Sequence, residues 1–304
     1  MVRGSDFFMK VIRAQVLGYC MGVRRAVEIA TQALHDHASD GTNVYSLGPL
    51  IHNPGVLSEL KAKGLSVLSS DTALPPTGKS VVVIRAHGTT PFLLDSLRHA
   101  GALVLDATCP RVHASQKRAA SCARQGGTVI VAGDKNHGEV VSICAHAGEH
   151  AVVVQNQAEA EDICVPDNAL LLSQTTFSPD DFADIIRVVR KKNPTVQVCN
   201  SICPATLERQ LALRNLAGKV EGLLVIGGAN SANTRRLYQI AQPLFSHLAL
   251  IENERDIPEA FFALNTVGLS AGASTPDSVI NAVQLTLEHG TFARFGAAPD
   301  THHL

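Results

Sequence analysis

Residues 103–110 read L-V-L-D-A-T-C-P, and the prediction of the fold begins with this stretch. The apolar run L-V-L is typical of a buried strand, and Pro110 stands where the first turn of a helix favours proline. Two other segments repeat the arrangement. V-I-R-A-Q-V precedes Cys20, and V-Q-V-C-N-S-I precedes Cys203, which Pro204 follows. Each segment therefore predicts a strand that leads through a cysteine into a helix.

These three cysteines mark a repeat, because successive members are 89 and 94 residues apart. After each cysteine a second apolar run, V-Y-S-L, T-V-I-V-A or L-L-V-I, leads into a polar loop that contains glycine. Two further apolar runs follow in each copy, and the last one ends in Ser-Pro or Thr-Pro. That ending is typical of a helix start with a capping hydroxyl. The predicted caps are Thr90, Ser178 and Thr275.

The same order of strands and helices, three times over, predicts a parallel α/β protein. We expect three similar units at residues 10–100, 101–193 and 194–290, followed by a polar tail at 291–304. Functional loops of parallel sheets lie beyond the carboxyl ends of the strands. A trefoil of three α/β domains with pseudo-threefold symmetry would therefore bring the three cysteines to one centre.

Composition narrows the class of protein. The 304 residues include 45% hydrophobic residues and carry a formal net charge of -1, so charge favours neither nucleic acid nor a membrane. No apolar run approaches the roughly 18 residues of a membrane span, and the first ten residues lack a signal-peptide core. We therefore expect a cytoplasmic protein. In that reducing compartment, seven cysteines indicate metal binding or redox chemistry rather than disulfides.

Three converging thiolates are compatible with more than one kind of metal site. Catalytic zinc takes three protein ligands, although zinc ligands usually come from closely spaced pairs. A 4Fe–4S cluster normally has four cysteine ligands, and with three it keeps one iron open to substrate. The remaining four cysteines we interpret as small buried hydrophobic residues. They are Cys122, Cys144, Cys164 and Cys199.

The loops that follow the strands carry polar side chains suited to an anion. The candidates are His52, His87 and His137 in the first two units, and Ser231, Asn233 and Ser274 in the third. Imidazoles, hydroxyls and helix N-terminal amides are typical of a phosphate or diphosphate site. Glu139 is either a proton donor or a partner of the helix dipole. Thr175 and Thr176 either bind substrate or cap the next helix.

Eight motifs together resemble the LytB/IspH family. They are G-Y-C-M-G-V-R-R-A, G-P-L-I-H-N-P, R-A-H-G-T-T-P, D-A-T-C-P, S-Q-T-T, S-I-C-P-A-T-x-x-R-Q, N-S-x-N-T-R-R-L and G-A-S-T-P, spread between residues 11 and 283. The family comprises 4-hydroxy-3-methylbut-2-enyl diphosphate reductases of the non-mevalonate isoprenoid pathway. The resemblance implies removal of the C4 hydroxyl to give isopentenyl and dimethylallyl diphosphate. It also implies two electrons from ferredoxin or flavodoxin. We expect the chain to form a monomer or a homodimer.

Matched residue by residue, the resemblance implies roles for the candidates. One 4Fe–4S cluster would be held by Cys20, Cys109 and Cys203, with the fourth iron open. The diphosphate pocket would comprise His52, His87, His137, Ser231, Asn233 and Ser274. Glu139 and Thr175 would lie near the substrate hydroxyl, with Glu139 on the proton path and His137 beside them.

Three positions depart from the common pattern of the family. Gly138 stands where proline is usual, Ala232 where a second serine is usual, and Pro204 where tyrosine or phenylalanine is frequent. These departures keep open a divergent paralogue that acts as a redox sensor. A quinolinate-synthase-like enzyme is a further alternative, because it also uses three cysteines and threefold pseudo-symmetry. Such an enzyme should favour arginine for its small acids over this set of histidines and serines.

Overall fold

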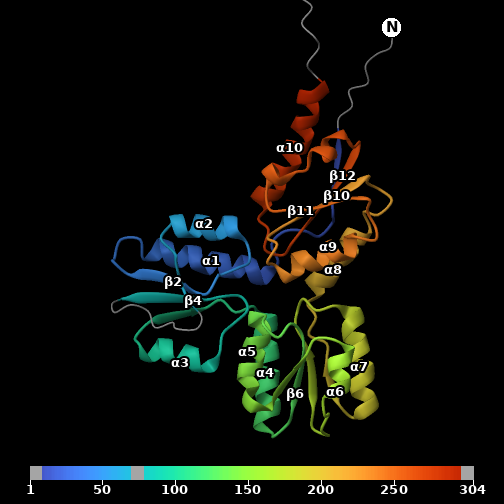
Figure 1. Cartoon of the computed structure of the whole chain (residues 1–304). Helices are drawn as coiled ribbons and strands as arrows, with labels where there is room; N and C mark the ends of the chain where they lie inside the picture. Colours follow the sequence, from blue (N-terminus) through green and yellow to red (C-terminus); the bar gives the residue numbers. More distant parts are fainter. Residues whose placement is uncertain (1–8, 70–78, 296–304) are drawn as a thin grey trace, which may run out of the picture. The chain divides into compact units, whose positions relative to one another are not determined.

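The computed structural model describes residues 9–69 and 79–295 (Figure 1). These residues form three sheets of four parallel strands, which confirms the predicted α/β class. The first sheet has the order β3-β2-β4-β5, with strands at Ser66–Leu68, Asn43–Leu47, Ser80–Ile84 and Leu103–Asp106. The second has the order β7-β6-β8-β9, at Ala151–Val154, Val129–Ala132, Leu170–Ser173 and Gln197–Cys199. The third has the order β1-β12-β10-β11, at Lys10–Arg13, Thr266–Ala271, Gly222–Ile226 and His247–Ile251.

The sheets are offset by one strand from the predicted repeats. Strand β5 belongs by sequence to 101–193, but it pairs with β4 of the first sheet. Strand β9 belongs to 194–290 and pairs with β8, while β1 belongs to 10–100 and pairs with β12. The strand before each cysteine thus finds its hydrogen bonds at the edge of another repeat's sheet. Spacing along the chain cannot indicate this, because pairing depends on which edge is open.

The described chain divides into two compact units. One combines the segment that ends at Cys20 with the chain from Ala205 onward, and it contains the third sheet. The other is Met21–Pro204, and it contains the first two sheets. The N-terminal strand therefore folds with the C-terminal part of the chain, although more than 200 residues separate β1 from β12.

Helices connect the strands in each unit. They are α1 (Met21–Asp36), α2 (Pro54–Ala62), α3 (Pro91–His99), α4 (Pro110–Arg124), α5 (Gly138–Ala147), α6 (Gln157–Asp162), α7 (Pro179–Lys192), α8 (Pro204–Arg214), α9 (Ala232–Ala241) and α10 (Asp277–Phe295). Short 3-10 helices occupy Gly148–His150, Glu254–Asp256 and Glu259–Ala263. Among the residues that the structure describes, no helix is both long and apolar enough to cross a membrane.

Two of the three predicted helix caps are confirmed. The hydroxyl of Thr90 accepts a hydrogen bond from the Leu93 amide at the start of α3, and Ser178 does the same for Asp181 in α7. The prediction for Thr275 is wrong. Its hydroxyl donates to the Ile226 carbonyl at 2.9 Å, because that carbonyl at the end of β10 lies within reach of the turn.

Helices cover both faces of the second sheet (Figure 1). Ile130 and Leu171 pack with residues of α6 and α7 on one face, while Val131 packs with residues of α4 and α5 on the other. Each of these three side chains is fully buried. Burial of one such side chain contributes about 1.5–3 kcal/mol to the stability of the folded state. The well-packed strands therefore fix the positions of the loops at their carboxyl ends.

The four remaining cysteines divide into two groups. Cys122, Cys144 and Cys199 are partly buried and pack against the α4–α5 side of the second sheet, as small hydrophobic residues do. Cys164 is exposed, so the prediction that it is buried is wrong. It lies in the connection between α6 and β8, where the chain runs at the surface.

Candidate functional site

Each cysteine of the repeat precedes a helix, as predicted. Cys20 stands directly before α1, Cys109 is the N-cap residue of α4, and Cys203 stands directly before Pro204 at the start of α8. All three are partly exposed thiols, and none of them forms a disulfide. Backbone amides at a helix N-terminus favour an anionic group beside them. The three positions therefore offer sulfur ligands in a setting suited to a metal.

Close backbone packing surrounds two of these cysteines within the unit Met21–Pro204. A Cβ atom on Gly22 would lie 2.7 Å from the Cys109 sulfur, so the first turn of α1 packs directly against that thiol. The Cys203 amide donates a hydrogen bond of 2.8 Å to the Thr175 carbonyl. In the other unit, the Cys20 amide donates to the Ala273 carbonyl at 3.1 Å. The Cys109 amide donates to the Ala86 carbonyl at 2.9 Å, so the backbone of each cysteine is hydrogen-bonded to a neighbouring loop.

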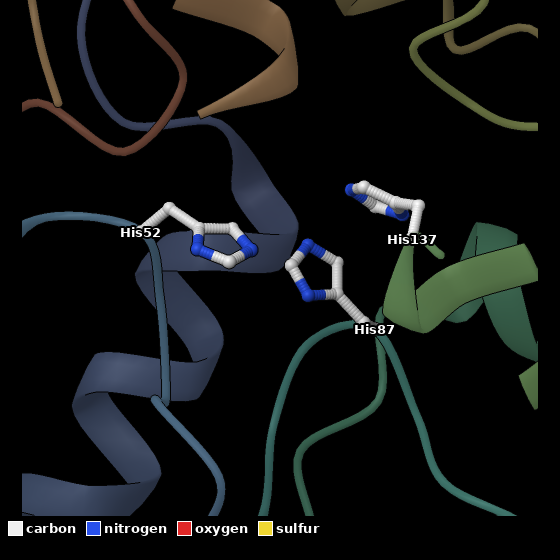
Figure 2. A group of neighbouring side chains, drawn as sticks. All are labelled: His52, His87 and His137. Carbon is white, nitrogen blue, oxygen red and sulfur yellow. The ribbon is translucent and has the colours of Figure 1, made fainter. Parts of the chain in front are cut away.

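Three histidines from three loops converge in the unit Met21–Pro204 (Figure 2). His52 follows β2, His87 follows β4, and His137 is the N-cap residue of α5 after β6. The ring centroid of His87 lies 5.0 Å from that of His52 and 4.8 Å from that of His137. The centroids of His52 and His137 are 6.3 Å apart. One nitrogen from each ring lies within 4.8 Å of the others. The structure thus brings together three residues that the sequence separates by 85 positions.

Burial and neighbouring cations shape the charge of this histidine cluster. Desolvation holds the pKa of His87 well below its ordinary value, and electrostatic repulsion from His137, His52 and Arg85 lowers that pKa further. His87 Nδ1 is buried and has no hydrogen-bond partner. A ligand that satisfies such an atom would remove the cost of leaving it unpaired.

Three imidazoles at these separations could bind a divalent transition metal or an anion. The position of Arg85 favours the anion. A Cβ atom on Gly138, the residue after His137, would lie 2.6 Å from a guanidinium nitrogen of Arg85. A permanent positive charge this near repels a metal cation and attracts an anion.

A buried carboxyl group follows the histidine cluster. Glu139, in the first turn of α5, is 1% exposed. Its Oε1 accepts from the Thr175 amide at 2.7 Å, and its Oε2 lies 2.7 Å from the Thr175 hydroxyl. Desolvation raises the pKa of Glu139 to about 7, although both hydrogen bonds from Thr175 act to lower it. At neutral pH this carboxyl group can hold and release a proton.

Thr176 is held differently from Thr175. Its hydroxyl oxygen accepts a hydrogen bond of 2.9 Å from the Gln174 side chain. The side-chain oxygen Oε1 of Gln174 in turn accepts from the Asp134 amide at 3.0 Å. This pair therefore links the loop after β8 to the loop that carries His137.

The other predicted anion ligands lie in the unit that contains the third sheet. Ser231 is the N-cap residue of α9, Asn233 lies in its first turn, and Ser274 follows β12. Each is about 5% exposed or less. The Asn233 amide nitrogen Nδ2 is buried without a hydrogen-bond partner. Within this unit, the carboxyl-end loops thus present small polar groups, one of them unsatisfied.

The sequence reasoning missed two arginines. Arg85 stands two residues before His87 in R-A-H-G, and its place in a strand-to-helix loop could have indicated a role. Arg209 is 3% exposed and donates to the carbonyls of Gly18 at 2.6 Å and Ala205 at 2.8 Å. It supports the loop that leads to Cys20. No local pattern predicts a buried arginine within a helix.

Fold and site together define a class: a parallel α/β enzyme that carries thiols, imidazoles and a protonatable carboxyl group in the loops at the carboxyl ends of its strands. Within that class, the chain belongs to the LytB protein family, whose profile matches residues 11–288. This confirms the family predicted from the motifs.

Named relatives agree with the family. A 4-hydroxy-3-methylbut-2-enyl diphosphate reductase of Treponema denticola is 43% identical, over 93% of this chain and 100% of the relative. The enzyme of that name from Aquifex aeolicus is 36% identical, over 91% of this chain and 96% of the relative. A solved structure of such a reductase, described as the terminal enzyme of the non-mevalonate pathway, superposes with a TM-score of 0.69 and 34% identity. It covers 92% of this chain and 99% of its own. The solved structure of the Plasmodium falciparum E-1-hydroxy-2-methyl-but-2-enyl-4-diphosphate reductase superposes with a TM-score of 0.81 and 26% identity. It covers 96% of this chain and 89% of its own.

Proposed function

We propose that this chain reduces 4-hydroxy-3-methylbut-2-enyl diphosphate to isopentenyl and dimethylallyl diphosphate. Membership of the LytB family and the names of the similar proteins support this activity. The observation that carries it is the histidine cluster beside the buried pair of Glu139 and Thr175. An anion site and a proton donor side by side are what an allylic alcohol with a diphosphate group requires.

An iron–sulfur cofactor belongs to this family. We propose one 4Fe–4S cluster on Cys20, Cys109 and Cys203, which requires these cysteines to meet as in the predicted trefoil. The residues fit such a group, because all three are partly exposed thiols at helix starts and none of them forms a disulfide. When bound, a cluster with three cysteine ligands supplies electrons and an open iron that acts as a Lewis acid.

The diphosphate is proposed to bind at His52, His87, His137, Ser231, Asn233 and Ser274. His87 Nδ1 and Asn233 Nδ2 are both buried and lack partners, so a ligand oxygen or hydroxyl would satisfy them. The α5 and α9 N-termini add backbone amides with positive partial charge. These groups would hold the substrate by its charged end and leave its C4 hydroxyl toward Thr175 and Glu139, with Thr176 beside them.

Glu139 is proposed to protonate the leaving hydroxyl. Its pKa of about 7 keeps roughly half of the carboxyl groups protonated at neutral pH. The C4–O bond breaks, and the oxygen leaves as water with the proton from Glu139. Two electrons, proposed to come from ferredoxin or flavodoxin, and one further proton complete the new C–H bond. Thr175 holds the carboxyl group in place through two hydrogen bonds.

Two other functions share features with this site. A quinolinate-synthase-like enzyme is disfavoured, because the family profile and the named relatives support the reductase instead. A redox sensor derived from this family remains the second candidate, since Gly138, Ala232 and Pro204 depart from the common family pattern. A sensor would not need the protonatable Glu139, and that difference separates the two.

The test is anaerobic incubation of reduced, cluster-loaded protein with the allylic diphosphate, followed by analysis for the two products. We expect both products from the unaltered chain. Glu139→Gln should lower turnover by about 100-fold or more, since general acids contribute on that scale. Glu159→Gln, on α6 in the same unit, is the matched control with near-normal turnover. Absence of both products from fully loaded protein would refute the reductase, and normal turnover in Glu139→Gln would refute the proton role.

A further inference from the structure

Arg85 lies where two loops of the histidine cluster meet. Its Cα belongs to the loop after β4, two residues before His87. Its guanidinium reaches the loops of the other two histidines. A Cβ atom on Gly48, at the head of the His52 loop, would lie 3.0 Å from one terminal nitrogen. A Cβ atom on Gly138 would lie 2.6 Å from the other terminal nitrogen. The cation is thus packed among all three histidine-bearing loops.

Both contacts depend on glycine. Gly48 has a φ of 70°, a conformation that residues with a side chain rarely adopt. Gly138 is the first residue of α5 and has no such constraint, so any residue could take its backbone conformation. Its lack of a side chain therefore serves a different need. It leaves the space beside His137 to the guanidinium of Arg85.

An arginine suits this position chemically. The guanidinium is always charged, and its planar set of N–H donors matches phosphate oxygens in pairs. The three imidazoles can each donate only one or two hydrogen bonds, and burial disfavours a positive charge on His87. A diphosphate beside an uncharged His87 gains no positive charge from that ring, and the guanidinium of Arg85 is placed to supply one.

We propose that Arg85 is a further diphosphate-binding residue of the histidine cluster, and that Gly138 is the residue that admits its guanidinium. This inference rests on the proposed diphosphate site. It assigns a reason to the glycine at 138, because a side chain there would occupy the space of the Arg85 guanidinium.

The two residues are coupled, which makes the proposal testable. Gly138→Ala would displace the end of a flexible side chain rather than the backbone, and alanine is the better helix former. The fold should therefore tolerate it. Anaerobic, cluster-loaded protein is titrated with inorganic diphosphate by calorimetry at fixed ionic strength. Arg85→Met should weaken binding by about 10- to 100-fold, the loss expected for a charged hydrogen-bonding group. Arg85→Lys should recover part of it.

Gly138→Ala should also weaken binding in the unaltered protein, yet have no further effect in the Arg85→Met background. A purely structural arginine would give equal losses in Met and Lys variants, and Gly138→Ala would then act the same in both backgrounds. Either result overturns the proposal.

His52→Gln is the reference variant for the site itself. If His52→Gln weakens diphosphate binding while Arg85→Met does not, the site stands and the role of Arg85 is refuted. If neither variant affects binding, the diphosphate does not bind here and both proposals fail. Circular dichroism and iron content verify that each variant is folded and loaded.

Discussion

The buried Glu139 carboxyl group predicts an unusual dependence of stability on pH. Its pKa rises from 4.5 to about 7 on folding because burial disfavours the charged form. The folded protein therefore binds the proton more tightly than the unfolded chain does. The stabilising contribution is fully present below about pH 4.5 and is lost as the pH rises through 7. A difference of this size corresponds to about 3 kcal/mol.

The measurement is urea unfolding of anaerobic protein at several pH values between 5 and 8, with Glu139→Gln beside the unaltered chain. Glutamine is neutral at every pH; its Oε1 can accept from the Thr175 amide, and its Nε2 can donate to the Thr175 hydroxyl oxygen. The free energy of unfolding of the unaltered chain, relative to that of Glu139→Gln, should fall by about 2–3 kcal/mol across this range. Other titrating groups cancel in the difference.

Glu159→Gln supplies the control, because the pKa of Glu159 is lowered by hydrogen bonds from Gln155 and Lys135. That carboxyl group is ionised in both the folded and unfolded chains above pH 5. The difference in free energy of unfolding between Glu159→Gln and the unaltered chain should therefore stay constant with pH. A constant difference for Glu139→Gln as well would refute the buried, protonatable carboxyl group on which the proposed proton transfer depends.

Two further substitutions test the supports around the cysteines. Gly22→Ala would place a Cβ atom 2.7 Å from the Cys109 sulfur, so anaerobically purified protein should hold less iron and sulfide. Gly55→Ala, whose Cβ atom would meet its nearest neighbour at 3.4 Å, should load normally, and equal contents in both variants would contradict the steric argument. Arg209→Met removes hydrogen bonds to the buried Gly18 carbonyl and the partly buried Ala205 carbonyl, and should cost about 2–3 kcal/mol. An unchanged midpoint of thermal unfolding would contradict that role.

The α/β class was predictable because the signals for it are local. The apolar runs that became β2, β6 and β10 each precede a glycine-containing loop, and Thr90 and Ser178 cap helices as the Ser/Thr-Pro pattern indicates. Strand propensity, first-turn prolines and capping hydroxyls act within a few residues of one another. The family, too, was readable from short motifs in order along the chain.

Which edge each strand joins is a property of the folded chain alone. The sequences of β1, β5 and β9 do not indicate the strands with which they pair. A parallel pair depends on which sheet edge is open and on how helices pack over that edge. The same limit applies to Arg85. Its place in the sequence, two residues before His87, does not indicate the space beside Gly138. That space exists only where the two loops pack together.

The pattern of residue types along the chain thus settled the elements, the family and the candidate cysteines and histidines. Tertiary structure alone decided the strand exchange, the burial of Glu139 against Thr175, and the arginine packed among three loops. The physical reason is common to all three. Edge pairing, desolvation and close packing depend on atoms that are distant in sequence, and they come into being only when those atoms meet.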